Sequence, residues 1–193
     1  MRLQDKFYNN IRRNNIPFWI TWEITYKCNH KCKFCYNDEE SKPELTYKQV
    51  CEALDRLKEA GALHILFTGG EPFIRNDFLD IIKYARQNSF EVSIYSNGSF
   101  ITKEISDKIS ALRVSFIGIT VHSLKKEVFE NITGIPDSFS RVMSAIKFLR
   151  QNNIPLRIKT SFLKDNYHEV SRLWNFAERL GYLFHYGYNL IPC

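Results

Sequence analysis

The sequence predicts an α/β fold, a partial (β/α)6-type TIM barrel with parallel strands. Short segments rich in branched and aromatic residues alternate with amphipathic helical patterns along the whole chain. Such alternation is typical of parallel strands joined by right-handed crossovers. No dinucleotide-binding glycine fingerprint follows the first predicted strand, which favours a barrel over a doubly wound sheet. The length of 193 residues and the hydrophobic content of 44% suit one domain with a sizeable core.

Six segments have the length and composition of β-strands. They span residues 18–25, 64–68, 91–95, 114–121, 156–161 and 183–188. We expect the barrel to occupy residues 18–193, preceded by an N-terminal extension over residues 1–17. Because no helical pattern follows the sixth strand, we also expect the barrel to be truncated there and the natural protein to continue.

Five amphipathic helices separate the predicted strands. Their apolar positions are Val50, Leu54 and Leu57; Phe78, Ile81, Ile82 and Ala85; Ile105, Ile109 and Leu112; Phe139, Val142, Met143, Ile146 and Leu149; and Val170, Leu173, Trp174, Ala177 and Leu180. The first helix should run over about residues 47–60, with Gly61 ending it. Thr102 is the expected N-cap of the third helix, and Gly181 should end the fifth.

The net charge is +6, from 27 basic and 21 acidic residues. The basic residues are scattered apart from short runs such as Arg12-Arg13 and Lys125-Lys126, so we expect no nucleic-acid partner. No apolar run reaches the roughly 20 residues of a membrane span, and the N-terminus has no secretory signal pattern. We therefore expect no membrane association and a cytoplasmic location, where thiols stay reduced.

Three cysteines, Cys28, Cys32 and Cys35, follow the first predicted strand within eight residues. Loops at this position carry the chemistry of parallel α/β folds. The C-x3-C-x2-C spacing can bring three sulfurs around one centre. Lys31 and Lys33 flank the thiols and are expected to lower their pKa values.

Three kinds of metal site compete for this loop. A structural zinc ion wants four ligands, and His30 could supply the fourth. A ferredoxin-type cluster wants a fourth cysteine, for which neither Cys51 nor Cys193 is suitably spaced. A [4Fe–4S] cluster with three protein ligands would leave one iron open to a small molecule, and the loops after the next strands favour it. Cys51 is expected in the core, and Cys193 is interpreted as an unremarkable thiol.

The second predicted strand runs directly into Gly69-Gly70-Glu71-Pro72. Two glycines allow close approach of the backbone to a ligand, or positive φ. The carboxylate of Glu71 can accept from an ammonium group, and Pro72 fixes the exit of the loop. An ordinary strand–helix turn explains this stretch equally well when it is taken alone.

Polar residues also end the later predicted strands. Ser96 and Asn97 suit a ribose, although an Asx turn before Gly98 is an alternative. Either Thr120 or His122 is expected to face the same rim, and either Lys159 or Thr160 should point into the barrel. All of these ends should meet at one rim, because carboxyl ends of parallel strands lie together.

The stretches "CNHKCKFCY", "GGEP" and "SNG", in this order, resemble the radical S-adenosylmethionine (SAM) superfamily. The later stretch from "GITVHS" to "LKDN" is similar to the branch that contains peptide-modifying enzymes and anaerobic sulfatase maturases, which often carry a C-terminal SPASM domain. The resemblance implies two cofactors, a [4Fe–4S] cluster and SAM.

The resemblance also implies a role for each matching residue. Cys28, Cys32 and Cys35 would ligate the cluster, and the open iron would bind the amino and carboxylate groups of SAM. The implied SAM-binding residues are Tyr36 near the adenine, Gly69, Gly70, Glu71 and Pro72 at the methionine, Ser96 and Asn97 at the ribose or carboxylate, and Thr120 in the pocket wall.

The implied activity is reductive cleavage of SAM to methionine and a 5′-deoxyadenosyl radical that abstracts hydrogen from a substrate. A peptide or protein side chain is the expected substrate, and a one-electron reductant such as flavodoxin or ferredoxin is the expected partner. Two alternatives stand beside this hypothesis. One is a non-catalytic zinc or iron–sulfur binding module, and the other is an inactive fragment of such an enzyme.

Overall fold

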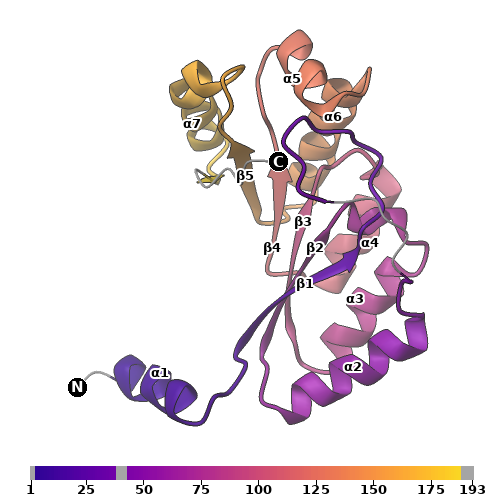
Figure 1. Ribbon diagram of the computed structural model, residues 1–193, viewed down its shortest axis with the longest axis vertical. Coiled ribbons are helices and arrows are strands. Elements are labelled where there is room, and N and C mark those ends of the chain that lie inside the picture. Colours follow the sequence, from indigo (N-terminus) through magenta and orange to yellow (C-terminus); the bar gives the residue numbers. More distant parts are fainter. Residues whose placement is uncertain (1–2, 38–42, 188–193) are drawn as a thin grey trace.

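The computed structural model describes residues 3–37 and 43–187. Six strands form one open sheet in the order β1-β2-β3-β4-β5-β6 (Figure 1), and every neighbouring pair is parallel. The strands are β1 Trp19–Thr25, β2 His64–Gly69, β3 Glu91–Ser96, β4 Phe116–Thr120, β5 Leu156–Ser161 and β6 Leu183–Gly187. The predicted partial barrel with parallel strands is confirmed.

The strands are connected by α-helices and two short 3-10 turns. The helices are α1 Leu3–Arg13, α2 Tyr47–Glu59, α3 Phe78–Gln87, α4 Lys103–Leu112, α5 Lys126–Thr133, α6 Ser138–Gln151 and α7 Val170–Arg179, and the turns are η1 Pro72–Ile74 and η2 Tyr167–Glu169. Figure 1 shows α2, α3 and α4 in sequence along one side of the sheet, with α1 set apart from it. Neither α1 nor α5 was predicted from the sequence.

Two helices begin at side-chain caps. Thr46 and Gln49 form a capping box at the start of α2, in which the Gln49 side chain accepts from the Thr46 N–H at 2.9 Å. Thr102 caps α4 as predicted, accepting from the backbone N–H of Ile105 at 3.2 Å. Such caps satisfy backbone donors that the first helical turn leaves unpaired.

The two faces of the sheet differ in character. Alternate side chains, such as Ile65, Val92 and Ile117, are fully buried and pack with the helices into one core. The opposite, concave face carries the intervening residues. On it, Lys159 of β5 is aligned with Thr120 of β4 and with β6. Polar side chains therefore gather on the concave face, toward the carboxyl ends of the strands.

Some details differ from the sequence-based predictions. Val114 and Val121 are buried but lie outside β4. Trp174 is 50% exposed although it follows the apolar stripe of α7. Cys51 is only partly buried, so its assignment to the core was wrong, since Val50 and Leu54 fill the inner face of α2. The predicted strand end at residue 188 and Cys193 lie outside the described residues.

Among the helices of the described chain, none combines the length and apolar character needed to cross a membrane.

Candidate active site

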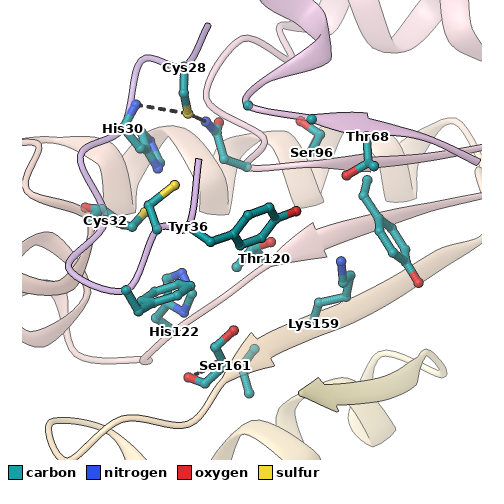
Figure 2. A pocket seen from close by; sticks show the side chains of 18 of the residues that line it. Cys28, His30, Cys32, Tyr36, Thr68, Ser96, Thr120, His122, Lys159 and Ser161 are labelled. Atoms are coloured by element: carbon teal, nitrogen blue, oxygen red, sulfur yellow. Dashed lines mark hydrogen bonds between the residues drawn. The ribbon is translucent and has the colours of Figure 1, made fainter. Parts of the chain in front are cut away.

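A cavity of about 330 Å³ opens on the concave face at the carboxyl ends of the strands (Figure 2). This volume is at the lower end of the range of small-molecule sites. The predicted site residues that line it are Cys28, Cys32, Cys35, Tyr36, Gly69, Gly70, Ser96, Asn97 and Thr120. Glu71 and Pro72 are buried behind the lining instead.

The cysteine loop is held by the last turn of α5. The backbone N–H of Lys31 donates to the carbonyl of Thr133 at 2.8 Å, and that of Lys33 to the carbonyl of Ile132 at 3.1 Å. Gly134 ends α5 with a positive φ of 69°, and a Cβ there would lie 2.9 Å from the Lys31 carbonyl oxygen. The helix end and the loop are therefore in direct backbone contact.

Burial controls the acidity of two of the thiols. It raises the pKa of Cys28 and raises that of Cys32 to about 12, with the neighbouring cysteines acting in the same direction. The prediction that Lys31 and Lys33 lower the thiol pKa is wrong for Cys28 and Cys32, because burial is the largest influence on both pKa values and raises them. Metal binding would have to displace these protons.

The donor set of the loop, three cysteine thiols, is of the kind that ligates iron–sulfur clusters. In the described parts of the chain, no three His, Cys, Asp or Glu side chains are grouped as ligands of one metal ion. A zinc ion would need sulfurs about 2.3 Å from a single point, whereas a cubane binds each thiolate at a different iron. His30 is also engaged elsewhere, since its Nε2 lies 2.7 Å from the Ser99 hydroxyl.

Gly69 and Gly70 permit a close backbone contact between two loops. Gly69 has φ of 130°, and a Cβ there would lie 2.1 Å from the carbonyl oxygen of Thr25. A Cβ at Gly70 would lie 2.2 Å from the carbonyl oxygen of Lys27. The N–H of Gly70 donates to Thr25 and that of Glu71 to Lys27, each at 2.8 Å. The glycines thus bring the loop after β2 against the backbone that leads into Cys28.

The carboxylate of Glu71 is fully buried and faces the loop after β3. It accepts from the Ser96 hydroxyl at 2.8 Å, from the Asn97 N–H at 2.7 Å and from the Phe73 N–H at 3.2 Å. Burial raises the pKa of Glu71 to about 7, although the three hydrogen bonds act in the opposite direction. In this structure these three donors occupy the carboxylate, and its contact with an ammonium group stays a prediction.

Asn97 links the loop after β3 to the cysteine loop. Its side-chain amide donates to the Asn29 side chain at 2.8 Å and to the Cys28 sulfur at 3.8 Å. The Ser96 hydroxyl is likewise used within the protein, donating to Glu71 and accepting from the Gly98 N–H at 2.9 Å. In this structure both residues hold the three loops together, and their contact with a ribose stays a prediction.

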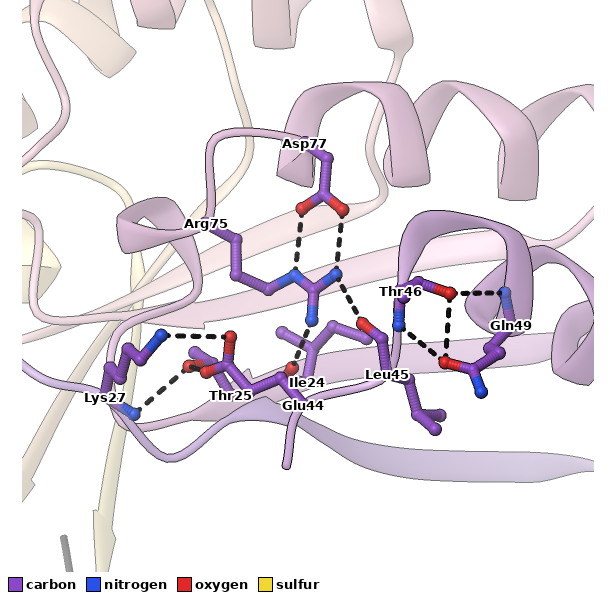
Figure 3. Close-up of polar contacts among 9 residues, drawn as sticks. All are labelled: Ile24, Thr25, Lys27, Glu44, Leu45, Thr46, Gln49, Arg75 and Asp77. Atoms are coloured by element: carbon purple, nitrogen blue, oxygen red, sulfur yellow. Dashed lines mark hydrogen bonds and ion pairs between the residues drawn. The ribbon is translucent and has the colours of Figure 1, made fainter. Parts of the chain in front are cut away.

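Tyr36 and Arg75 fix the outer parts of the site. The Tyr36 hydroxyl donates to Glu23 at 2.9 Å, and burial together with this bond raises the pKa of Tyr36 to about 12. The Arg75 guanidinium makes two bonds to Asp77, at 2.8 and 2.9 Å, and also donates to the carbonyls of Ile24 and Leu45 (Figure 3). Arg75 thereby joins the end of β1 to the exit of the loop after β2.

The wall formed by β3, β4 and β5 contains a half-buried cation, Lys159. The Lys159 Nζ lies 3.1 Å from the centroid of the Tyr95 ring. Gly118 leaves room for both side chains, because a Cβ there would lie 2.6 Å from Tyr95 Cδ1 and 2.9 Å from Lys159 Cδ. Burial lowers the pKa of Lys159 to about 7. Of the two candidates on β5, Lys159 is therefore the one on the concave face, whereas Thr160 alternates with it and is buried on the opposite face.

His122 belongs to the same cavity wall and is 2% exposed. Its ring packs edge-on against Phe34 of the cysteine loop, with centroids 5.0 Å apart, and burial lowers its pKa to about 3. The side chain of Asn166 donates to the His122 carbonyl at 2.8 Å and to the Ser161 carbonyl at 3.0 Å. The backbone around His122 is thereby fixed to the end of β5.

Several cavity residues were not predicted. They are Phe34, Thr68, Tyr95, Phe129, Thr133, Ser161 and His185. Alternation along β3 could have placed Tyr95 on the face of Asn97, but the register that aligns β6 with β5 is not encoded in any local pattern.

Comparison with known proteins agrees with this geometry. The sequence profile of the Radical SAM superfamily matches residues 22–177, which is most of the chain. The chain belongs to the radical SAM superfamily. The resemblance carried by the cysteine, GGEP and SNG stretches is thereby confirmed. Radical SAM enzymes use a [4Fe–4S] cluster and SAM as cofactors.

Similar proteins of this radical SAM family include an "AdoMet-dependent heme synthase" of Methanosarcina barkeri. It is 29% identical over 185 residues, which are 94% of this chain and 53% of the relative. The "antilisterial bacteriocin subtilosin biosynthesis protein AlbA" of Bacillus subtilis is 29% identical over 171 residues, which are 86% of this chain and 38% of the relative. The chain spans about half the length of the first of these curated relatives and less of the second.

A solved structure, SuiB of Streptococcus suis bound to its precursor peptide SuiA, shares the radical SAM fold with a TM-score of 0.79. Sequence identity is 19%, and the aligned region covers 94% of this chain and 42% of SuiB. This likeness establishes the fold and agrees with the open six-stranded sheet.

Proposed function

We propose that this chain is the catalytic core of a radical SAM enzyme that initiates hydrogen abstraction from its substrate. One observation carries the proposal. Cys28, Cys32 and Cys35 line the same cavity as the loops after β2 and β3. That cavity lies at the carboxyl ends of the strands, where parallel α/β barrels carry their chemistry.

When bound, a [4Fe–4S] cluster would supply the electron that cleaves SAM to methionine and a 5′-deoxyadenosyl radical. Cys28, Cys32 and Cys35 would hold this cluster. The backbone at Gly69 and Gly70 and the side chains of Tyr36, Ser96, Asn97 and Thr120 would surround SAM. Glu71 and Pro72 would act from behind the lining, by fixing the loops after β2 and β3.

The protein contributes rigidity and exclusion of solvent. The buried bonds of Glu71 to Ser96 and Asn97 hold two loops at fixed positions, and Asn97 extends this network to Cys28. Cluster and SAM would therefore meet within one braced set of loops. A partly enclosed cavity also limits competing hydrogen donors near a reactive radical.

For the substrate, we propose a peptide or protein side chain. The similarity to AlbA, a protein named for the biosynthesis of a bacteriocin, supports this class. A heme precursor is the second candidate, favoured by the longer match to the heme synthase. We further infer that a flavodoxin or ferredoxin reduces the cluster, and that the protein works in the cytoplasm, where cysteines stay reduced.

The test is anaerobic reconstitution of the complete natural protein with iron and sulfide. Iron and sulfide content, the electron paramagnetic resonance spectrum of the reduced cluster and conversion of SAM to 5′-deoxyadenosine are measured. Alanine variants of Cys28, Cys32 and Cys35 should each lose the cluster signal and SAM cleavage. Cys51→Ala is the matched control, since Cys51 lies on α2 outside the cavity, and it should retain both.

The proposal would be overturned by a protein that takes up stoichiometric zinc and no iron–sulfur cluster. It would also fail if the reduced, cluster-loaded protein left SAM intact. Incubation with a peptide probe, and separately with an iron porphyrin, then distinguishes the two candidate substrates through formation of 5′-deoxyadenosine above the substrate-free rate.

A further inference from the structure

The concave face carries two cations of β5 that lie over aromatic rings of β3 and β4. The Lys159 Nζ lies over Tyr95, and the Arg157 guanidinium carbon lies 3.6 Å from the centroid of Phe116. In the described part of the chain, neither side chain forms an ion pair with a carboxylate. Lys159 lines the cavity and Arg157 lies two residues earlier on the same face of β5.

An unpaired ammonium group in this position is unfavourable by itself. Removing a charge from water has a large cost unless an opposite charge compensates it. The ring of Tyr95 offsets only part of that cost, because a cation–π contact is weaker than an ion pair. The protein nevertheless reserves space for the arrangement, since any side chain at Gly118 would collide with both Tyr95 and Lys159.

A second polar group in the wall also lacks a partner. The Nδ1 atom of His122 is buried and has no hydrogen-bond partner in the structure. His122 lines the cavity, and so does His185, which is aligned with Lys159 across β5 and β6. Buried polar groups in proteins are nearly always satisfied, so an orphan group in a cavity wall points to a ligand.

We propose that Lys159, together with His122 and His185, forms a substrate subsite for an anionic oxygen group, a carboxylate or a phosphate. The ammonium group would provide the charge, and the imidazoles would provide hydrogen bonds. This inference rests on the proposed function and names the chemistry that the substrate must carry. Both candidate substrate classes can supply it, through acidic side chains or peptide termini in one case and the propionate side chains of a porphyrin in the other.

The subsite is separate from the expected position of the SAM methionine. Figure 2 shows Lys159 across the cavity from Cys28 and Cys32, with Tyr36 and Thr120 between them. The carboxylate of a SAM molecule held at the cluster would lie beside the cysteine loop. The cation on β5 is therefore left for a group of the substrate.

Binding of two probe anions, glutarate and pyrophosphate, tests the inference. Dissociation constants are measured by calorimetry on the cluster-loaded protein with SAM and, in parallel, on the cluster-free protein. Lys159→Met should weaken binding of the preferred probe at least tenfold, whereas Lys159→Arg should stay within threefold of the wild type. Lys147→Met, an exposed lysine of α6, is the matched control and should bind like the wild type. Preference for glutarate or for pyrophosphate identifies the group as a carboxylate or a phosphate.

The inference is overturned if neither probe binds the wild type, or if Lys159→Met binds both as tightly as the wild type. It is also overturned if Lys159→Met weakens SAM itself tenfold and leaves the probes unchanged, which would assign Lys159 to the SAM carboxylate. Failure of the proposed function would be recognised differently, by absence of the cluster or of SAM cleavage. The anion titrations of the cluster-free protein would still test the subsite in that case.

Discussion

The hydroxyl of Ser123 donates a 2.8 Å hydrogen bond to the fully buried Glu169. The next backbone N–H, that of Leu124, donates to the other carboxylate oxygen, and the N–H of Lys125 donates to the Ser123 hydroxyl. The same pattern occurs at Glu71. The Ser96 hydroxyl donates to one carboxylate oxygen and the Asn97 N–H donates to the other, while the Gly98 N–H donates to the Ser96 hydroxyl.

Two loops on the rim of the cavity are thus braced in the same way. In each of these hydrogen-bond networks, which we call braces, the side chain of a glutamate from one loop accepts hydrogen bonds from a neighbouring loop. The glutamates are Glu71 and Glu169. A carboxylate suits this place because it accepts several hydrogen bonds and donates none. One network joins the loops after β2 and β3, and the other joins the loop after β4 to η2 after β5.

Replacing Glu169 by Gln should lower the free energy of unfolding by about 1–3 kcal/mol, because an amide NH2 would face the donors of Ser123 or Leu124. Urea denaturation followed by circular dichroism measures the change. Glu178→Gln on the exposed side of α7 is the control and should be neutral. An equal effect of both variants would show that the brace does not contribute to stability.

The pH dependence of stability should report on Glu71. Its pKa is raised from 4.5 to about 7 in the folded protein, so the folded state binds more protons between these values. The stability contribution of the protonated group is therefore present below about pH 4.5 and is lost as the pH rises through about 7. The cluster-free wild type should lose more stability than Glu71→Gln over this range. Parallel pH profiles for the two proteins would contradict the assignment.

Gly118→Ala should disturb the packing of Tyr95 and Lys159, because the new methyl group would lie within 3 Å of both side chains. Overpacking of this kind costs about 1–3 kcal/mol of stability. A double-mutant cycle with Tyr95→Leu separates the steric effect from a backbone effect. The loss of stability caused by Gly118→Ala should be smaller in the Tyr95→Leu background, where the aromatic ring is absent. An equal loss in both backgrounds would place the strain in the backbone of β4.

Anion binding at Lys159 should weaken with rising pH. The pKa of Lys159 is about 7 in the protein without a bound anion, so each pH unit above this value should weaken binding about tenfold. The groups around it are Tyr95 on β3, His122 after β4 and His185 on β6. The pKa of His122 is about 3, so its protonation does not change over this range. Calorimetry at pH 6 to 9 measures the slope.

The His185→Gln variant tests whether the pH dependence of anion binding requires the histidine on β6. The same slope in His185→Gln assigns the pH dependence to Lys159. Loss of the slope in that variant would instead assign it to the histidine on β6.

The sequence predicted the parts of this site that local patterns determine. The alternation of strands and helices placed Cys28, Gly69, Ser96 and Thr120 at one rim, and they line one cavity. What was not predictable is the direction of each side chain. Glu71 reads as a ligand-binding carboxylate, yet its partners come from a loop 25 residues later in the chain.

The pKa values of the cysteine thiols could not be predicted from the sequence either. The lysines beside the cysteines suggested activated thiols, but the burial that raises the thiol pKa depends on contacts of the cysteine loop with α5 and with the loop after β3. Lys159 and His185 lie 26 positions apart, and only the register of β5 and β6 shows that they share a wall. Tertiary context, rather than residue type, decides these properties.

The backbone bonds from Lys31 and Lys33 to the end of α5 make the cysteine motif dependent on a segment about one hundred residues away. A short cysteine-bearing peptide cut from this protein would lose those carbonyl acceptors and with them the shape of its turn. Transfer of the motif to another scaffold would therefore require the end of α5 as well, including Gly134, which allows the two segments of the chain to come into contact.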